Sequence, residues 1–88
     1  MTERVATIVN QDGIHARPAA RIVRLANSFT AHIELAKDGV TVNGKSIMGV
    51  MMLAAEYGSS LTIRADGPDE EQAVAALAEL VATGFGEP

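Results

Sequence analysis

Apolar residues in this chain recur with two different periods, and segments with each period alternate along the chain. Segments in which every second residue is apolar are rich in Val, Ile, Leu and Thr, which is typical of β-strands with one buried face. Segments in which apolar residues recur three or four apart are typical of helices with a buried stripe. The order strand, helix, strand, strand, helix, strand, helix is predicted for residues 4–10, 18–27, 31–37, 40–43, 46–55, 61–65 and 69–83.

One dipeptide supplies the only tight hairpin in this order. Asp38-Gly39 lies between two adjoining strands, and Asp-Gly is strongly favoured in two-residue hairpin turns. An open four-stranded sheet with helices packed on one face satisfies the order, so we expect an α+β fold. The pattern fixes the order of strands within the sheet only weakly. Because the chain has no repeat or linker, we expect residues 1–88 to form a single domain.

Composition excludes several classes of protein. Hydrophobic residues make up 48% of the chain and aromatic residues only 3%, so we expect an aliphatic core. The net charge of −4 counts against nucleic-acid binding, which needs a basic surface. Without cysteine, neither a disulfide nor a thiolate zinc site can form. No apolar run approaches the roughly 20 residues that span a bilayer, and no signal-peptide hydrophobic region is present, so we expect a cytoplasmic protein without membrane insertion.

Three local features of the helices and the C-terminal end can be predicted. Asp69 is expected to cap the last helix, with Gln72 three residues later completing an Asp variant of the capping box. Met52 and Leu53 are the expected core members of the second helix. Residues 84–88 follow the last helix and are expected to form a tail.

His15 lies at the start of the first helix. Pro18 follows three residues later, and proline is favoured in a helix's first turn. The free amides near Ala16 and Arg17 favour an anion there, and the Arg17 guanidinium adds donors suited to phosphate oxygens. A neutral imidazole nitrogen beside such a site can attack phosphorus and form a labile phosphohistidine. From this spacing alone, the alternative that His15 only caps the helix stays open.

Two motifs together resemble one known family. Gly-Ile-His-Ala-Arg-Pro-Ala-Ala at residues 13–20 and Gly-Lys-Ser-Ile-Met-Gly-Val-Met at residues 44–51 closely resemble the HPr family. Members of this family are histidine-containing phosphocarriers of the bacterial sugar phosphotransferase system. The resemblance covers essentially the whole chain, including its length and element order. It implies an open-faced sandwich, in which three helices cover one face of a four-stranded antiparallel sheet.

The resemblance also implies roles for the residues around His15. Enzyme I, charged by phosphoenolpyruvate, would phosphorylate His15 at Nδ1, and His15 would pass the phosphoryl group to sugar-specific IIA domains. Arg17 resembles the phosphate-steering arginine of the family, Pro18 matches its helix-opening proline, and the Ala16 amide would face the phosphoryl oxygens. The chain would then be a substrate of other enzymes and not an enzyme itself, would need no cofactor, and would be a monomer.

Ser46 begins the second helix, where serine is a favoured N-cap. A phosphate on its hydroxyl would lie at a helix N-terminus, whose dipole favours negative charge. From the residues alone, a simple cap stays open. The segment resembles the regulatory-serine region of HPr proteins from organisms with an HPr kinase/phosphorylase. That resemblance implies this kinase and a catabolite-control transcription regulator as further partners, and slower transfer to His15 once Ser46 is phosphorylated.

An apolar cluster surrounds Ser46. Core packing is one interpretation of its methionines, and docking of several partners is another, because methionine is common on such surfaces. The resemblance places a partner-docking face beside the His15 helix, formed by Ala20, Arg24, Asn27, Ile47, Met48 and Met51. Thr7, Asn10 and Gln11 precede His15 and are candidates for the border of its site.

Residues 39–46 match the nucleotide-binding P-loop pattern G-x-x-x-x-G-K-S. Val40-Thr41-Val42, however, favours an extended strand over a loop that wraps phosphates. Asp38-Gly39 fits a hairpin turn better, and an 88-residue chain leaves little room for the parallel sheet of P-loop enzymes. These observations argue against nucleotide hydrolysis.

The remaining ionisable residues indicate no second site. His32 is expected on the outward face of a strand as an ordinary surface residue, and the carboxylates of residues 69–71 suit a helix N-terminus. With only two histidines, far apart, and no cysteine, we expect no metal site.

A phosphocarrier of the HPr type is therefore the favoured function. The first alternative is an HPr-like regulatory paralogue that acts in nitrogen-type or catabolite signalling without sugar transport. Retention of His15 counts against those family members that act only through the serine. A small ligand-binding module without phosphorylation is the second alternative, and it leaves the placement of His15, Arg17 and Pro18 unexplained.

Overall fold

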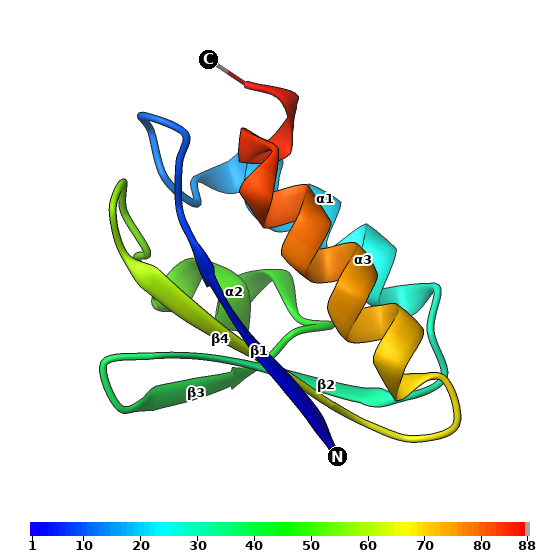
Figure 1. Cartoon of the computed structure of the whole chain (residues 1–88). Coiled ribbons are helices and arrows are strands. Elements are labelled where there is room, and N and C mark those ends of the chain that lie inside the picture. The colour runs from blue at the N-terminus through cyan, green and yellow to red at the C-terminus, as the bar shows by residue number, and fades with distance from the viewer. Residues whose placement is uncertain (88) are drawn as a thin grey trace.

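The computed structural model describes residues 1–87 and contains every helix and strand predicted from the sequence, in the predicted order (Figure 1). The elements are β1 (Thr2–Thr7), α1 (Ala16–Asn27), β2 (His32–Lys37), β3 (Val40–Asn43), α2 (Ile47–Met52), β4 (Ser60–Asp66), α3 (Glu70–Ala82) and the 3₁₀ helix η1 (Gly84–Gly86). The α+β fold class is confirmed. None of the helices in residues 1–87 is long and apolar enough to cross a membrane.

The strands form one antiparallel sheet in the order β1-β4-β2-β3. The Asp38-Gly39 hairpin joins β2 to β3, and both of its residues have the positive φ that a tight hairpin turn needs (51° and 81°). The other two neighbouring pairs, β1 with β4 and β2 with β4, are separated along the chain by both strands and helices. The three α-helices lie on the same side of the sheet (Figure 1), and α1 contacts both α2 and α3. The predicted open-faced sandwich is therefore confirmed.

Aliphatic side chains from the sheet and the helices meet in one core. The alternation in β2 turns Ile33 and Leu35 inward, and the alternation in β4 does the same for Leu61 and Ile63. The buried residues of the helices are Pro18, Ala19, Ile22, Ala26, Val50, Ala73, Val74, Leu77, Ala78 and Val81. The expectation of an aliphatic core is confirmed, with Phe85 as its one aromatic member.

The bounds of two N-terminal elements differ from the prediction. β1 ends at Thr7, three residues earlier than predicted, and residues 8–15 form the connection to α1. α1 begins at Ala16, two residues before Pro18, so that the proline lies within the first turn. This connection therefore places His15 immediately before the first residue of α1.

α2 is shorter than the predicted helix of residues 46–55, because it ends at Met52 and Ala54 adopts a positive φ of 50°. A six-residue helix turns only a narrow stripe toward the core, and Val50 occupies that stripe. Met52 is 74% exposed, so the prediction that it belongs to the core is wrong. Leu53 is buried, as predicted.

Asp69 is the N-cap residue of α3, as predicted, but the predicted capping box is wrong. The Asp69 side chain makes no cap hydrogen bond, and its carboxylate instead accepts the backbone N–H groups of Thr30 and Ala31, both at 2.8 Å. These bonds, above all the one from Thr30, hold the pKa of Asp69 below its ordinary value. Glu70, not Gln72, reaches back three residues and accepts the Gly67 N–H at 3.1 Å.

The segment after α3 is not a tail. The side chain of Phe85 is fully buried, although φ at this residue is +58°, a left-handed conformation that costs a non-glycine residue roughly 1 kcal/mol. Gly84 and Gly86 on either side also have positive φ. Pro88, which the prediction included in the tail, lies outside the described residues.

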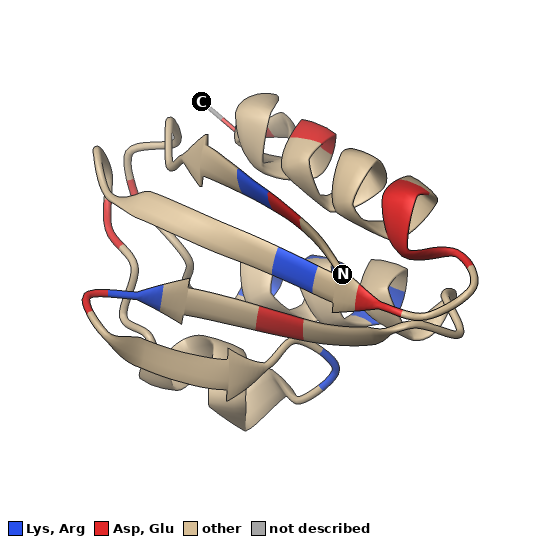
Figure 2. Cartoon of the chain, turned by 60° about the horizontal axis from the view of Figure 1, so that its bottom comes forward, with Lys and Arg blue, Asp and Glu red and all other residues tan. Residues whose placement is uncertain are grey.

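The open face of the sheet carries a ladder of opposite charges. Arg64 on β4 pairs in register with Glu3 on β1 and with Glu34 on β2. The Arg64 Nε donates to the Glu3 carboxylate at 2.6 Å. Figure 2 shows basic and acidic residues next to one another on adjoining strands of this sheet.

Glu70 ties the N-terminus of the chain to the first turn of α3, and this contact predicts a dependence of stability on pH. Its carboxylate accepts the Thr2 hydroxyl at 2.6 Å and lies 3.1 Å from the Met1 ammonium nitrogen. The hydrogen bonds from Thr2 and Gly67, followed by the ammonium group, lower the pKa of Glu70 to about 2 from 4.5. Because the folded-state pKa is the lower one, this stabilisation is present above pH 4.5 and is lost as the pH falls toward 2.

We therefore expect Glu70→Gln to flatten the acid limb of stability between pH 4.5 and 2, measured by urea unfolding at a series of pH values. Glu71→Gln removes the same charge from the exposed neighbouring residue and is the matched control. Identical pH profiles for the wild-type protein and Glu70→Gln would contradict this account.

Candidate active site

His15 is the N-cap residue of α1. Its backbone is extended (φ −95°, ψ −166°), and its carbonyl accepts the Ala19 N–H at 3.0 Å. The His15 side chain makes no capping hydrogen bond, so the simple capping role left open by the sequence does not describe this imidazole. The backbone places the ring at the mouth of the helix and leaves it available for other contacts.

The connection that carries His15 is held against the loop after α2. The Ile14 N–H donates to the Ala55 carbonyl at 2.8 Å. Gly13 has a φ of +64°, and a Cβ atom at this position would lie only 2.5 Å from the same carbonyl oxygen. Only glycine permits both this conformation and this close approach. Gly13 therefore determines the position of the backbone immediately before His15.

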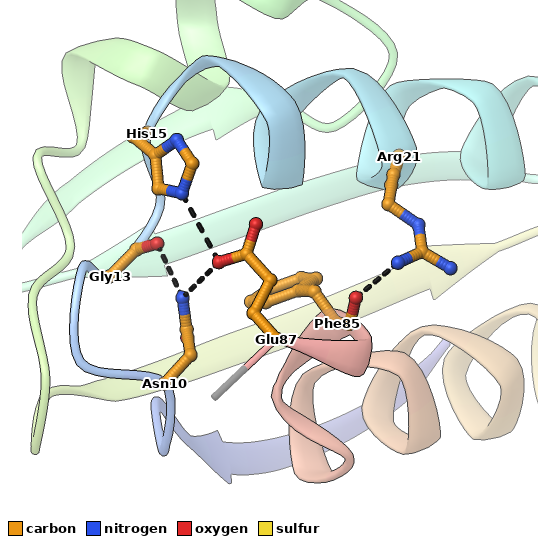
Figure 3. Close-up of polar contacts among 6 residues, drawn as sticks. All are labelled: Asn10, Gly13, His15, Arg21, Phe85 and Glu87. Atoms are coloured by element: carbon orange, nitrogen blue, oxygen red, sulfur yellow. Dashed lines mark hydrogen bonds and ion pairs between the residues drawn. The ribbon is translucent and has the colours of Figure 1, made fainter.

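The two nitrogens of the His15 ring have different surroundings. The Nε2 atom lies 3.1 Å from Oε1 of Glu87 (Figure 3). Nδ1 lies on the other side of the ring from Glu87 in the same view, and no group of residues 1–87 is hydrogen-bonded to it. The His15 side chain is 42% exposed, so a partner can reach Nδ1.

Asn10, which is hydrogen-bonded to Glu87, is almost completely buried. Its Nδ2 donates to the Gly13 carbonyl at 2.8 Å and to Oε1 of Glu87 at 3.2 Å. Asn10 therefore links residues 8–15, the segment that contains His15, to the C-terminal segment (Figure 3).

A shallow pocket beside the ring is lined by Gln11, Asp12, His15, Arg17 and Glu87. Arg17 is exposed, and the N–H groups of Ala16 and Arg17 donate no hydrogen bond within residues 1–87. Two amides and a guanidinium beside an imidazole can hold the oxygens of a phosphoryl group while Nδ1 contacts its phosphorus. In the described part of the chain, no group of three or more His, Asp or Glu side chains is arranged to hold a metal ion.

Comparison with known proteins decides the family. The family model described as "PTS HPr component phosphorylation site" matches residues 2–83. The chain belongs to the HPr family. A phosphocarrier protein HPr from Cupriavidus necator is 48% identical over 87 residues, which cover 99% of this chain and 98% of that protein. Membership of the HPr family makes the chain a phosphocarrier of the phosphotransferase system, a role that differs from that of a catalyst.

Two solved structures of HPr relatives extend this comparison. HPr-C-His from Thermoanaerobacter tengcongensis superposes with a TM-score of 0.95 at 44% identity, over 100% of this chain and 99% of that chain. Crh, a catabolite repression protein of Bacillus subtilis, is 43% identical, with a TM-score of 0.77 over 96% of this chain and 97% of that chain. The Crh structure is described as a dimer with a swapped domain, so the monomer expected here stays a prediction.

The other predicted site residues lie on two adjoining helices of this HPr fold. Ser46 caps α2, and its Oγ accepts the Gly49 N–H at 3.2 Å. α1 packs against α2, and Asn27 Nδ2 at the end of α1 lies 3.5 Å from the Lys45 carbonyl. The predicted docking residues that are exposed on these helices are Arg24, Asn27, Ile47, Met48 and Met51. Ala20 is half-buried.

The three candidates that precede His15 lie in different places. Asn10 and Gln11 border the site, through a hydrogen bond to Glu87 and through the pocket lining respectively. Thr7 ends β1 and lines a separate groove against α3, so the structure does not bring it to His15.

Glu87 is the residue of this site that the sequence did not indicate. It follows His15 by 72 residues, and no local pattern links them. The one available signal was Phe85, because a large apolar residue two positions before Glu87 fits a buried anchor better than a tail.

Proposed function

We propose that the chain accepts a phosphoryl group on Nδ1 of His15 from phosphorylated Enzyme I and donates it to a sugar-specific IIA domain. The observation that carries this proposal is the exposed His15 ring at the mouth of α1, with Nε2 bound to Glu87 and Nδ1 open. Residues 1–88 act in this reaction as one monomeric phosphocarrier domain.

The chemistry follows from the groups around the ring. The Nδ1 lone pair attacks phosphorus, the bond between phosphorus and Enzyme I breaks, and an N–P bond forms on His15. The amides of Ala16 and Arg17, together with the Arg17 guanidinium, face the phosphoryl oxygens, and Pro18 lies in the first turn of the helix that orients these amides. The N–P bond is labile because imidazole is a tolerable leaving group, so a IIA domain can take the phosphoryl group in turn.

The charge of α1 supports transfer between proteins. The helix carries Arg17, Arg21 and Arg24 and contains no Asp or Glu, although the whole chain has a net charge of −4. A basic helix on an acidic protein attracts a partner whose site carries a phosphoryl group and acidic side chains. The exposed Ile47, Met48 and Met51 beside it supply the apolar part of the docking surface.

Ser46 is proposed as the regulatory site, phosphorylated by an HPr kinase/phosphorylase and read by a catabolite-control transcription regulator. We expect Ser46→Asp to keep the fold, because aspartate is also a good N-cap, and to slow acceptance from phospho-Enzyme I about tenfold, which corresponds to ~1.4 kcal/mol of like-charge repulsion. Initial rates of phosphoryl transfer measure this effect. Ser46→Ala removes the hydroxyl without adding charge and should keep the wild-type rate. Equal rates for Ser46→Asp and Ser46→Ala would remove Ser46 from the proposal.

The similarity to Crh favours one alternative, an HPr-like regulatory protein without a role in sugar transport. A two-step assay distinguishes the two functions. The chain is first phosphorylated with phosphoenolpyruvate and Enzyme I, then separated and mixed with a IIA domain. Transfer of the phosphoryl group to the IIA domain supports the carrier function. Phosphorylation without transfer to any IIA domain of the same host would support the regulatory alternative.

A further inference from the structure

Two hydrogen bonds converge on one oxygen atom of Glu87. Its Oε1 lies 3.1 Å from Nε2 of His15 and 3.2 Å from Nδ2 of Asn10 (Figure 3). Glu87 is only 15% exposed in its side chain, so water competes poorly for this oxygen. The contact between the C-terminal segment and His15 is therefore partly shielded and specific to one atom.

The orientation of the Asn10 amide is determined by its neighbours. The Gly13 carbonyl near it can only accept a hydrogen bond, so the amide nitrogen and not the amide oxygen must face this carbonyl. This orientation leaves the buried Oδ1 of Asn10 without a hydrogen-bond partner in residues 1–87. Turning the amide would place Oδ1 against the Gly13 carbonyl oxygen, where neither atom can donate a hydrogen bond.

This orientation decides which atom of the His15 ring carries a proton. Since Asn10 Nδ2 can only donate, Oε1 of Glu87 acts as an acceptor toward it. An ionised carboxylate can only accept hydrogen bonds, so Nε2 of His15 is the donor in its own contact with Oε1. In the neutral ring, a proton on Nε2 leaves the lone pair on Nδ1.

The segment before Glu87 holds it in place. Phe85 is buried in the core, and its carbonyl accepts a hydrogen bond from the Arg21 guanidinium on α1 (Figure 3). The Glu87 N–H donates to the Gly84 carbonyl at 2.9 Å. The carboxylate is thus presented by an anchored turn, and α1 contributes both His15 at its start and Arg21 further along.

From these contacts we propose that Glu87 is a positioning residue for His15. Its carboxylate accepts a hydrogen bond from the Nε2–H of His15, so that the lone pair of the neutral ring is on the exposed Nδ1. The hydrogen bond from Asn10 holds the carboxylate in this position. The inference rests on the proposed phosphorylation of His15 and deepens it by naming what selects the reacting nitrogen.

Nitrogen NMR tests the selection of the tautomer without any phosphoryl transfer. Long-range ¹H–¹⁵N spectra of the neutral His15 ring should show the wild-type proton almost entirely on Nε2. Glu87→Ala should give a mixture of the two tautomers, whereas Glu87→Gln, which keeps an Oε1 acceptor, should resemble the wild type. His32, which lies on the exposed sheet face, is the reference ring within each sample. Identical tautomer fractions in the wild type and Glu87→Ala would overturn the proposal.

Transfer kinetics provide the second readout. The initial rate of phosphoryl acceptance from phospho-Enzyme I should fall roughly tenfold or more in Glu87→Ala. Loss of a residue that hydrogen-bonds to a metal-ligating histidine has an effect of this size. Glu87→Gln should keep most of the wild-type rate. Glu79→Gln, an exposed carboxylate on α3, is the control for the change of charge. A Glu87→Ala variant with the wild-type rate would also overturn the proposal.

The two hypotheses fail in different ways. If the wild-type protein is never phosphorylated but its tautomer depends on Glu87, the proposed function fails and the contact between Glu87 and His15 is upheld. If the wild type is phosphorylated and neither the tautomer nor the rate depends on Glu87, the positioning role fails and the phosphocarrier function stands.

Discussion

Replacing His15 with alanine is expected to abolish phosphoryl acceptance while the protein stays folded. The imidazole is the proposed nucleophile, and the structure places it at the mouth of α1 beside the Ala16 and Arg17 amides. The ring is 42% exposed and its one side-chain hydrogen bond within residues 1–87 is to Glu87, so its loss should change the free energy of unfolding by about 1 kcal/mol. Acceptance is measured with labelled phosphoenolpyruvate and Enzyme I, and folding by circular dichroism and urea unfolding.

His32→Ala is the matched control, because it removes the other histidine of the chain from the exposed sheet face. It should accept phosphate at the wild-type rate. Acceptance by a folded His15→Ala variant would show that the phosphoryl group goes elsewhere.

Replacing Phe85 with alanine is expected to give the largest loss of stability. The side chain is fully buried, and removal of a buried phenylalanine costs about 3–5 kcal/mol. Domains of this size have a total stability of roughly 5–15 kcal/mol, so the loss is a large fraction of the whole. Urea unfolding followed by circular dichroism measures it.

The second phenylalanine provides the comparison. Phe29 is only partly buried, and Phe29→Ala should therefore cost clearly less than Phe85→Ala. If Phe85→Ala fails to fold, Phe85→Leu keeps most of the apolar volume and should lose only about 1 kcal/mol. An unfolding free energy unchanged by Phe85→Ala would contradict the buried position of this residue.

The fold could be predicted where its signals are local. The alternation in residues 31–37 and 61–65 indicates strands with one buried face, and Asp38-Gly39 indicates a two-residue hairpin turn. The order β1-β4-β2-β3 depends instead on pairing between strands far apart in the chain. No pattern within a single strand specifies its partner, so the sequence constrained that order only weakly.

The candidate site divides in the same way. His15 and Ser46 are N-cap residues, and caps are recognised from the few residues around them. Asp69 also stands before a helix, but its carboxylate bonds to the backbone at residues 30 and 31, a tertiary contact that competes with the local capping pattern. Glu87 reaches His15 because the buried Phe85 side chain holds the C-terminal segment against the core. The glycines on both sides of Phe85 made this segment resemble a loose tail in the sequence.

The most direct test of the central claim is the intact mass of the purified protein after incubation with phosphoenolpyruvate and a catalytic amount of Enzyme I, measured before and after brief acid treatment. The account predicts a gain of the mass of one phosphoryl group that acid removes, as expected for a phosphohistidine at His15. No gain in mass, with an Enzyme I preparation that phosphorylates another carrier, would contradict it, and so would a gain that survives acid.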